Sequence, residues 1–409
     1  MNIGSGPQSA QRTMPNTTIA GRPGIAFVCL WAGVLNATAT APLSPALPAI
    51  ANELGGGADG SFVAQMIQTI SAIGMIVGAA FAGYVSEWLG RRLVILAGAV
   101  IFLVAGCAGL VLTDLNLLIA SRALTGVASG AMLATSYAVV GEHFIGDARN
   151  RILGFCGGAG AFAALVLLNI SGVMVDALGW RSVFALYLLG IVIIPFAFFS
   201  MYKGTVPKTD DAPLGWMPIL RLWPLWLLQI GFAIGVYMSV IQVPFIAAAK
   251  GISNASMIGL LVATTSVSAM CVALLYGTIR RFLDVKGMFV LISMAFAAGL
   301  LICAKSNGLL PFFIGTVVLG FGAGSLEPTI ISRALHEIPE RLHDRAAGTA
   351  ISTLFLGQFL NPIVVYPLVA ADGVAFATTV FGLIYAAVGA LFLLAIGMGR
   401  RRTLNARLA

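Results

Sequence analysis

The sequence predicts an all-α membrane protein, with twelve transmembrane helices arranged as two pseudo-symmetric six-helix bundles. Three observations support this prediction: the composition, the number of long apolar segments and an internal repeat. Of the 409 residues, 59% are hydrophobic and only 9% are charged, whereas a soluble domain is about 45–50% apolar and about 25% charged. So few polar side chains cannot cover a globular surface in water, so the sequence predicts a chain that is surrounded by lipid.

Twelve segments are long enough to cross a bilayer, which takes about 20 mostly apolar residues. They cover 25–50, 61–86, 93–113, 115–141, 152–175, 180–202, 220–249, 255–279, 287–304, 309–333, 346–370 and 374–399. Short loops separate most of them. The segment 203–219 is longer, charged and contains proline, so we expect it to be a cytoplasmic loop between bundles 25–202 and 220–399. Residues 1–24 and 400–409 are predicted to be cytoplasmic tails, the second of them basic.

The basic residues predict the orientation of the chain. With the N-terminus inside, most of the 23 lysines and arginines fall in cytoplasmic segments. Arg181, Lys250 and Lys305 lie on the other side, and Arg122 lies within a span. Such an excess predicts that both termini face the cytoplasm. It also accounts for the net charge of +8 without a nucleic-acid partner.

The two halves repeat each other at an offset of 194 residues. Gly126 pairs with Gly320 at this offset, Gly130 pairs with Gly324, and Arg92 pairs with Lys286. Near the start of each half the offset becomes 196, where 47–55 matches 243–251. Two parallel repeats of six helices are the architecture of transporters whose bundles rock around a site near the bilayer midplane.

The loop sequence "GYVSEWLGRR", at 83–92, resembles the motif between helices 2 and 3 of the major facilitator superfamily. Gly83, Glu87, Gly90, Arg91 and Arg92 match that motif, while Trp88 departs from its usual basic residue. "RALTG", at 122–126, resembles the helix 4 motif of proton-coupled members, and "LGWRSVF", at 178–184, resembles a common start of helix 6. Within the family, the chain is most similar to the drug:proton antiporter branch.

The resemblance implies a conformational latch on the cytoplasmic side. Gly83 would let helix 2 approach helix 11 closely, Glu87 would lie near the positive end of that helix, and Arg91 would bridge Glu87 to Glu142. The expected latch residues are Gly83, Glu87, Gly90, Arg91, Arg92 and Glu142. The alternative is that these are ordinary positively charged loop residues on the inner side.

Glu327 is the one acidic residue that we place inside a span; the other acids lie in loops or at span ends. An ionisable side chain at the bilayer centre costs at least roughly 2.5–3.5 kcal/mol, so it usually marks function. Pro328 follows it and tends to kink the helix. We therefore predict that Glu327 binds and releases protons during transport. The alternative is a neutral acid that is hydrogen-bonded for packing.

Arg122 is the one basic residue within a span, and its guanidinium stays charged. It is predicted to contribute to proton coupling, either by binding an anionic substrate or by tuning a nearby acid. The alternative is a structural contact to backbone carbonyls. Arg122 and Glu327 are expected at different depths, about 9 Å from opposite sides of the membrane, so we predict no direct salt bridge between them.

Several polar residues in the spans are candidates for lining a substrate cavity, although each could equally be a packing contact. They are Asn36, Ser129, Gln229, Tyr237, Gln242, Asn169, Gln358 and Asn361. Three prolines in the first span, Pro42, Pro45 and Pro48, predict a bend there.

These patterns predict a secondary active transporter of the inner (cytoplasmic) membrane. We expect proton-coupled export of small amphipathic compounds by a monomer, with lipid, protons and substrate as its partners. A proton-coupled importer of a small solute or monocarboxylate is the alternative, and a non-transporting receptor or scaffold is more remote. No Walker lysine motif or nucleophile triad occurs, so neither ATP hydrolysis nor enzymatic activity is expected. No cofactor or metal site is expected either.

Overall fold

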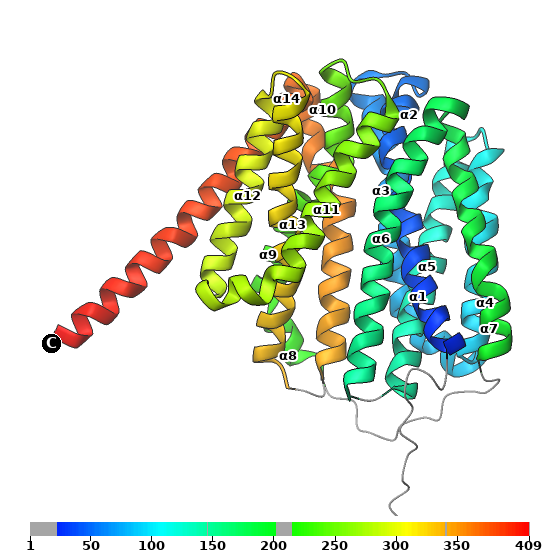
Figure 1. Cartoon of the computed structure of the whole chain (residues 1–409), viewed down its shortest axis with the longest axis horizontal. Coiled ribbons are helices and arrows are strands. Elements are labelled where there is room, and N and C mark those ends of the chain that lie inside the picture. Colours follow the sequence, from blue (N-terminus) through cyan, green and yellow to red (C-terminus); the bar gives the residue numbers. More distant parts are fainter. Residues whose placement is uncertain (1–22, 145, 202–214, 340–341, 409) are drawn as a thin grey trace, which may run out of the picture.

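A computed structural model describes residues 23–144, 146–201, 215–339 and 342–408. Every regular element within these ranges is a helix (Figure 1). Most of the predicted tail 1–24 and of the predicted loop 203–219 lies outside the described residues. The last helix continues to Leu408, through most of the segment that was predicted to be a basic tail.

The first bundle runs from Pro23 to Ser200. Its helices are α1 (Pro23–Thr40), η2 (Ser44–Ala46), α2 (Leu47–Glu53), α3 (Gly57–Leu89), α4 (Arg91–Cys107), η3 (Ala108–Leu110), α5 (Leu115–His143), α6 (Gly146–Leu178), η4 (Trp180–Leu189) and α7 (Gly190–Ser200).

The second bundle begins with a short helix and ends with a very long one. Its helices are α8 (Met217–Leu220), α9 (Trp223–Tyr237), η5 (Met238–Gln242), α10 (Val243–Ala249), α11 (Ala255–Phe282), α12 (Val285–Lys305), α13 (Leu309–Glu337) and α14 (His343–Leu408).

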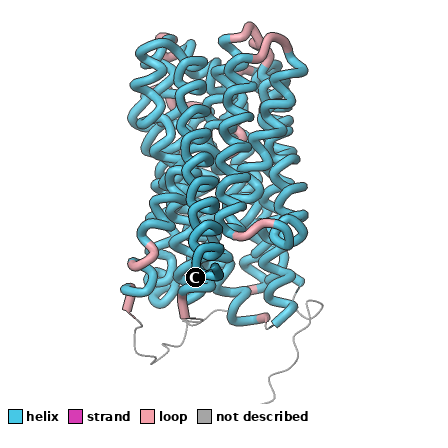
Figure 2. Tube along the Cα trace, turned by 90° about the vertical axis from the view of Figure 1, so that its left-hand side faces the viewer, coloured by secondary structure: helices cyan, strands magenta, loops and turns pink. Residues whose placement is uncertain are grey.

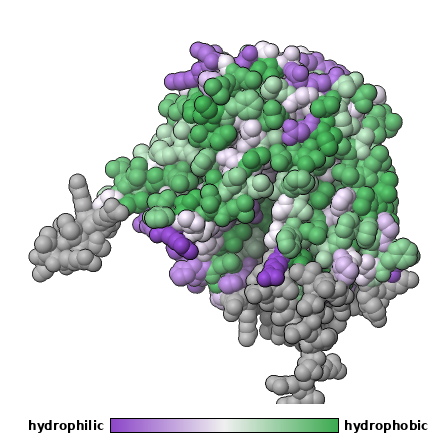
Figure 3. Space-filling model, in the orientation of Figure 1, coloured by the Kyte–Doolittle hydropathy of each residue, from purple (hydrophilic) through white to green (hydrophobic). Residues whose placement is uncertain are grey.

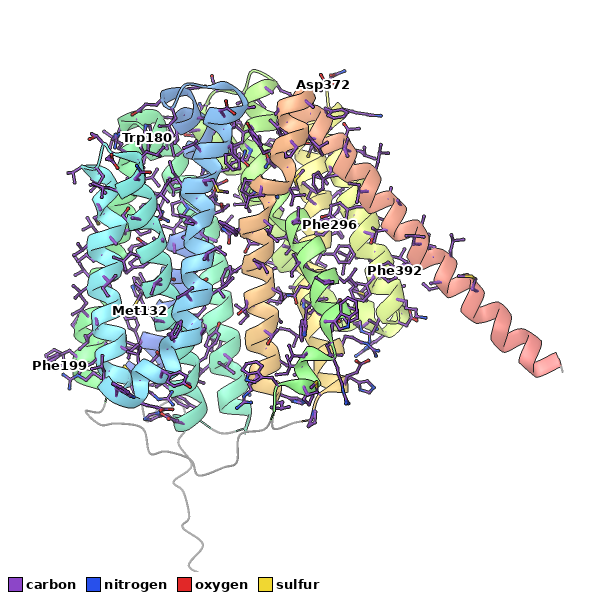
Figure 4. The ribbon with its side chains drawn as sticks, turned by 180° about the vertical axis from the view of Figure 1, so that it is seen from behind. Met132, Trp180, Phe199, Phe296, Asp372 and Phe392 are labelled. Atoms are coloured by element: carbon purple, nitrogen blue, oxygen red, sulfur yellow. The ribbon has the colours of Figure 1, made fainter. Side chains whose placement is uncertain are left out.

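The predicted number of crossings agrees with these helices. Eleven stretches of the described chain are long and apolar enough to cross a membrane, and the last of them, Arg345–Met398, is 54 residues long. This stretch is two helices, because Asp372 and Gly373 leave helical geometry between them. Figure 4 shows Asp372 at the turn between the two parts of α14. The second part then runs obliquely away from the bundle (Figure 1).

The first and seventh crossings are each interrupted at the corresponding place. In the first, the predicted bend lies between α1 and the seven-residue helix α2. In the seventh, a π-helical turn precedes the seven-residue helix α10. Proline is the second residue of both short helices, Pro48 and Pro244, where its missing N–H costs nothing. The 196-residue offset therefore corresponds to a repeated structural break.

The internal repeat is confirmed by the packing of glycines. α5 and α13 are both 29 residues long and begin 194 residues apart. A Cβ on Gly126 would lie 2.1 Å from Ser71 O, and one on Gly320 would lie 2.6 Å from Thr265 O. Gly130 likewise packs on the Met75 backbone, and Gly324 packs on the Ala269 backbone. Small residues thus allow the same close helix contact in both bundles.

The hydrophobic surface of the molecule matches a lipid environment. Apolar residues cover the middle of the visible face, and hydrophilic residues gather toward its upper and lower ends (Figure 3). Within each bundle a separate core is buried, with Phe102 and Tyr187 in the first and Phe296 and Tyr385 in the second. Viewed from the side, most of the helices run along one common direction (Figure 2).

The two ends of the helices differ in charge. We call the end at which α3 meets α4 the basic end, because Arg91, Arg92, Arg280 and Arg281 lie there; it is the lower end in Figure 1. We call the other end, at which α14 turns at Gly373, the opposite end. The basic end is the one predicted to face the cytoplasm.

Candidate functional site

At the opposite end, a carboxylate of the first bundle caps a helix of the second. Asp176, near the end of α6, accepts hydrogen bonds from Ala255 N and Ser256 N of α11, both at 2.8 Å. Its Oδ2 also accepts from Ser256 Oγ at 2.5 Å. Gly172, one turn earlier, allows the approach, because a Cβ there would lie 2.7 Å from Ala255 O. The N-terminal end of α11 favours negative charge, so Asp176 stabilises the contact between the bundles.

A second carboxylate joins the bundles on the other side of this interface. Tyr366 of α14 donates a hydrogen bond from its hydroxyl to Asp59 Oδ1 of α3 at 2.5 Å. The Tyr366 ring also packs against Phe62, with 4.8 Å between ring centroids. Nearer the first crossing, Ser44 Oγ donates to Val240 O at 2.5 Å.

Between these contacts lies a network of buried amides. Gln242 Nε2 donates to Gln65 Oε1 at 2.9 Å across the interface and to Asn361 Oδ1 at 3.0 Å within the second bundle. Asn361 Nδ2 donates in turn to Ile234 O. All three amides are at most 4% exposed. The opposite end is therefore closed by paired polar groups rather than by apolar contact alone.

At the basic end the bundles are apart. A Cβ added at Gly83, Gly154, Gly277 or Gly348 would meet no atom within 4 Å. A cavity of about 680 Å³ lies there between α3, α5 and the first part of α14. Its walls are mainly apolar. They consist of Met75, Ile76, Ala79, Arg91, Gly130, Leu133, Ala134, Tyr137, Ala138, Gly141, Leu153, Ala347, Gly348, Ile351, Ser352 and Phe355. The structure is thus open at the basic end and closed at the opposite end.

Glu327 lies at the interface between the bundles. It interacts electrostatically with Tyr137 of α5 and Tyr237 of α9, which belong to different bundles. Its side chain is exposed, and no ion pair or hydrogen bond joins it to another described residue. Because Glu327 interacts with one tyrosine of each bundle, this exposure is to the open interior between the bundles rather than to lipid. Tyr137 also lines the cavity, so Glu327 is next to the open space.

Arg122 is placed inside the first bundle and away from the cavity walls. It is fully buried, and its Nη2 donates to Ala39 O at 2.8 Å, in the last turn of α1. The guanidinium lies over the Tyr187 ring, 4.8 Å from its centroid. Its Nε and Nη1 have no partner. Among the described residues no ion pair joins Arg122 to Glu327. The hydrogen bond to Ala39 O corresponds to the alternative interpretation of Arg122, a structural contact to a backbone carbonyl.

Of the six predicted latch residues, the structure brings two together. Arg91 and Glu142 form an ion pair. Glu87 is exposed and has no ion pair with another described residue, so Arg91 does not bridge it to Glu142 here. Gly83 does not touch α14, and Arg92 lies over the Phe198 ring at 4.3 Å. Gly90 has a φ of 78° at the turn between α3 and α4, a backbone angle that favours glycine. This arrangement matches an open basic end, where a latch would be released.

The polar residues predicted to line a cavity are placed in several different settings. Gln242 and Asn361 belong to the amide network, and Tyr237 is near Glu327. Asn36 donates to Ser129 Oγ at 3.4 Å within the first bundle, and Gln229 donates to Ala350 O at 2.8 Å within the second. Asn169 donates to Leu165 O of its own helix, and the fully buried Gln358 has no partner on either amide atom.

Sequence reasoning missed the residues that join the bundles. Asp59 and Asp176 were assigned to span ends, where an acid is unremarkable, and Gln65 and Tyr366 were not singled out. Tyr137 was also missed, because the sequence around a single tyrosine in an apolar span does not reveal whether its side chain faces lipid, the helix core or a cavity. No local pattern marks such residues, since their partners are 79 to 307 positions away.

Comparisons with known proteins agree with this architecture. A family model described as "Major Facilitator Superfamily" matches residues 29–362. The multidrug transporter protein MdtP of Bacillus subtilis (strain 168) is 30% identical over 134 residues, which are 32% of this chain and 24% of that protein. A chloramphenicol resistance protein of Pseudomonas aeruginosa is 30% identical over 198 residues, 47% of this chain and 46% of that protein. The matched part is thus less than half the length of these relatives.

A solved structure of a D-xylose-proton symporter is similar to this chain over nearly its whole length. The TM-score is 0.70, and the match covers 90% of this chain and 96% of that one. The sequence identity is 16%, so this likeness concerns the fold alone.

Proposed function

The chain belongs to the major facilitator superfamily and is a multi-pass membrane transporter, and from this premise we propose that it exports small amphipathic organic molecules in exchange for protons. The two bundles would rock so that the cavity opens at either end in turn. The inner (cytoplasmic) membrane of the cell is the proposed location, with the basic end inside, and we propose that the protein acts as a monomer.

The observation that carries the proposal is the position of Glu327. A carboxyl group without a charged partner, placed between two bundles and beside an open cavity, is able to take up a proton in one conformation and lose it in the other. Tyr137 and Tyr237 are close enough to respond to its charge. Protonation of Glu327 would therefore change the electrostatic interaction of α13 with Tyr137 of α5 and Tyr237 of α9.

Export is favoured by two further features. The cavity walls are mainly apolar, which suits molecules that partition into membranes, and partial relatives carry the names multidrug transporter and chloramphenicol resistance protein. The alternative is a proton-coupled importer in which Arg122 binds a monocarboxylate. Because Arg122 is fully buried and bonded to Ala39 O, the geometry supports a positioning role for Arg122 between α1 and α5 instead.

The test of proton coupling is Glu327→Gln in proteoliposomes. The variant keeps the size of the side chain but cannot change charge, so we expect transport driven by a pH gradient to fall at least tenfold. Exchange of labelled for unlabelled substrate without a gradient should persist. Unchanged pH-driven transport, with exchange equal to the wild type, would contradict the assignment of Glu327.

The direction of transport is tested separately by growth. In a host that lacks its own efflux pumps, expression of an exporter raises tolerance to members of a toxin panel. The Glu327→Gln variant, expressed to the same level, is the matched control. Increased sensitivity on expression of the wild type would instead support the importer.

A further inference from the structure

The cavity at the basic end has a polar group at one extremity and apolar walls elsewhere. Arg91 is the one cation among the residues that line it, and Tyr137 and Ser352 add two hydroxyl groups. The lining residues of α5 run from Gly130 to Gly141, which spans about 16 Å at 1.5 Å per residue. A volume of about 680 Å³ is within the range of small-molecule sites. The cavity is therefore elongated and amphipathic.

The hydrogen-bonding capacity of Arg91 is only partly used. Its Nη2 pairs with Glu142, while Nε and Nη1 are buried and have no hydrogen-bond partner among the described residues. A buried donor without a partner is unfavourable, because it has lost its hydrogen bonds to water. A guanidinium carries five N–H groups, so Arg91 is able to keep Glu142 and still bind a second acceptor. The side chain is 18% exposed and is part of the cavity wall.

We propose that this cavity binds an amphipathic anion, whose carboxylate or similar head accepts hydrogen bonds from Arg91 and whose apolar body lies along α3, α5 and α14. The body would contact Met75, Leu133 and Phe355. Between its head and its far end it would pass Tyr137, which interacts electrostatically with Glu327. A head group with negative charge is disfavoured beside Glu327, so the orientation of the ligand follows from the two charges.

This binding site rests on the proposed function, because we take the cavity to be part of the path that the transported substrate follows. The cavity lies between α3 and α5 of one bundle and α14 of the other, and α3 and α14 lie side by side (Figure 4). A ligand here separates the walls that must meet when the basic end closes. It is therefore expected to bind the open form that is described and to leave before the basic end closes.

The test measures binding without any gradient, with the full chain in lipid nanodiscs. Three probes share a ten-carbon chain and differ in head group: decanoate, decanol and decylamine. Isothermal titration, corrected with empty nanodiscs, is expected to give decanoate an affinity at least tenfold above that of decanol, with decylamine weakest. This ratio corresponds to one charge-assisted hydrogen bond.

Two substitutions separate recognition by Arg91 from the loss of its ion pair. Arg91→Gln removes the donor charge and is expected to abolish the preference for decanoate. Glu142→Gln also breaks the ion pair but leaves Arg91 free, so decanoate affinity should stay equal or rise. Arg92→Gln is the matched control, because Arg92 stacks on Phe198 instead of lining the cavity. A fourth variant, Ala134→Phe, fills the cavity and should weaken all three probes.

Three results would overturn the inference. They are equal affinities of decanoate and decanol in the wild type, an unchanged preference in Arg91→Gln, and the same loss in Glu142→Gln as in Arg91→Gln. None of them depends on proton coupling. If Glu327→Gln transports normally while decanoate binding still requires Arg91, the proposed coupling fails and the binding site stands.

Discussion

Asp176 stabilises the closed end through hydrogen bonds that no sequence pattern predicts. Its two carboxylate oxygens accept three bonds from the first two residues of α11. Hydrogen bonds to a charged group contribute about 1.5–3 kcal/mol each, and those at a helix N-terminus add the interaction with the helix dipole. A single side chain of the first bundle thus holds the start of a helix in the second.

Removal of this carboxylate should make the opposite end open more often. In Asp176→Ala we expect amide hydrogen exchange in 40–50 and 238–249 to accelerate at least tenfold, because 1.4 kcal/mol already changes an equilibrium tenfold. Asp114→Ala is the matched control. Asp114 also caps a helix, but it accepts from Leu117 N within the first bundle. If both variants accelerate exchange equally, Asp176 contributes to the overall stability of the protein and does not specifically hold the opposite end closed.

At the scale of helices, glycines divide into those that permit a permanent contact and those that face open space. Gly126 and Gly130 of α5 lie against the backbone of α3, and Gly320 and Gly324 of α13 lie against that of α11. Gly83, Gly154, Gly277 and Gly348, toward the basic end, have no neighbour within 4 Å. The first group fixes each bundle as a unit, while the second lies where the bundles are apart.

The two groups should respond differently to an added methyl group. In Gly130→Ala the Cβ would lie 2.2 Å from Met75 O, so α3 and α5 must separate and stability should fall by about 1–3 kcal/mol. Gly83→Ala should leave the unfolding temperature in detergent unchanged, since the space is empty. Equal unfolding temperatures for Gly130→Ala and the wild type would show that α3 and α5 are less tightly packed than described.

At the scale of the whole molecule, one rigid-body motion of the two bundles would close the open end and open the closed end. The hydrogen bonds between the bundles, among the described residues, are made by Ser44, Asp59, Gln65 and Asp176 of the first bundle, and they lie toward the opposite end. The cavity and the glycines that face open space lie toward the basic end. If the bundles move as units, separation at one end must bring the other end together.

A bulky side chain at the closed interface should therefore reverse the arrangement. Gly172→Trp places an indole where a Cβ would already lie 2.7 Å from Ala255 O. Spin labels at the exposed positions 88 and 282 report on the basic end, and labels at 111 and 310 report on the opposite end. We expect the first distance to shorten and the second to lengthen.

The control for this experiment is Gly157→Trp, at a position with no neighbour within 4 Å. It should leave the distance between 111 and 310 unchanged. If Gly172→Trp lengthens one distance without shortening the other, the bundles do not move as rigid units.

The sequence by itself determined the class of protein, the number of crossings and the repeat. These depend on local length and apolar composition, which the bilayer imposes segment by segment, and on matched glycines such as Gly126 and Gly320. It also pointed to Glu327, because an isolated acid in an apolar span is conspicuous without any structure. The ion pair of Arg91 and Glu142 was predictable from the sequence, since the family resemblance placed both residues at the same end.

Only the tertiary structure decided which end is closed and which residues close it. The two bundles pack against each other, and this brings together Asp176 with Ser256 and Gln65 with Gln242. Packing between segments that are far apart in the chain leaves no periodic pattern in the sequence of either segment. The structure also separated Arg122, which is buried against α1, from Glu327, which faces the open interior between the bundles. Hydropathy gives the depth of a residue along its helix but not the direction in which its side chain points, because that direction depends on the helices that surround it.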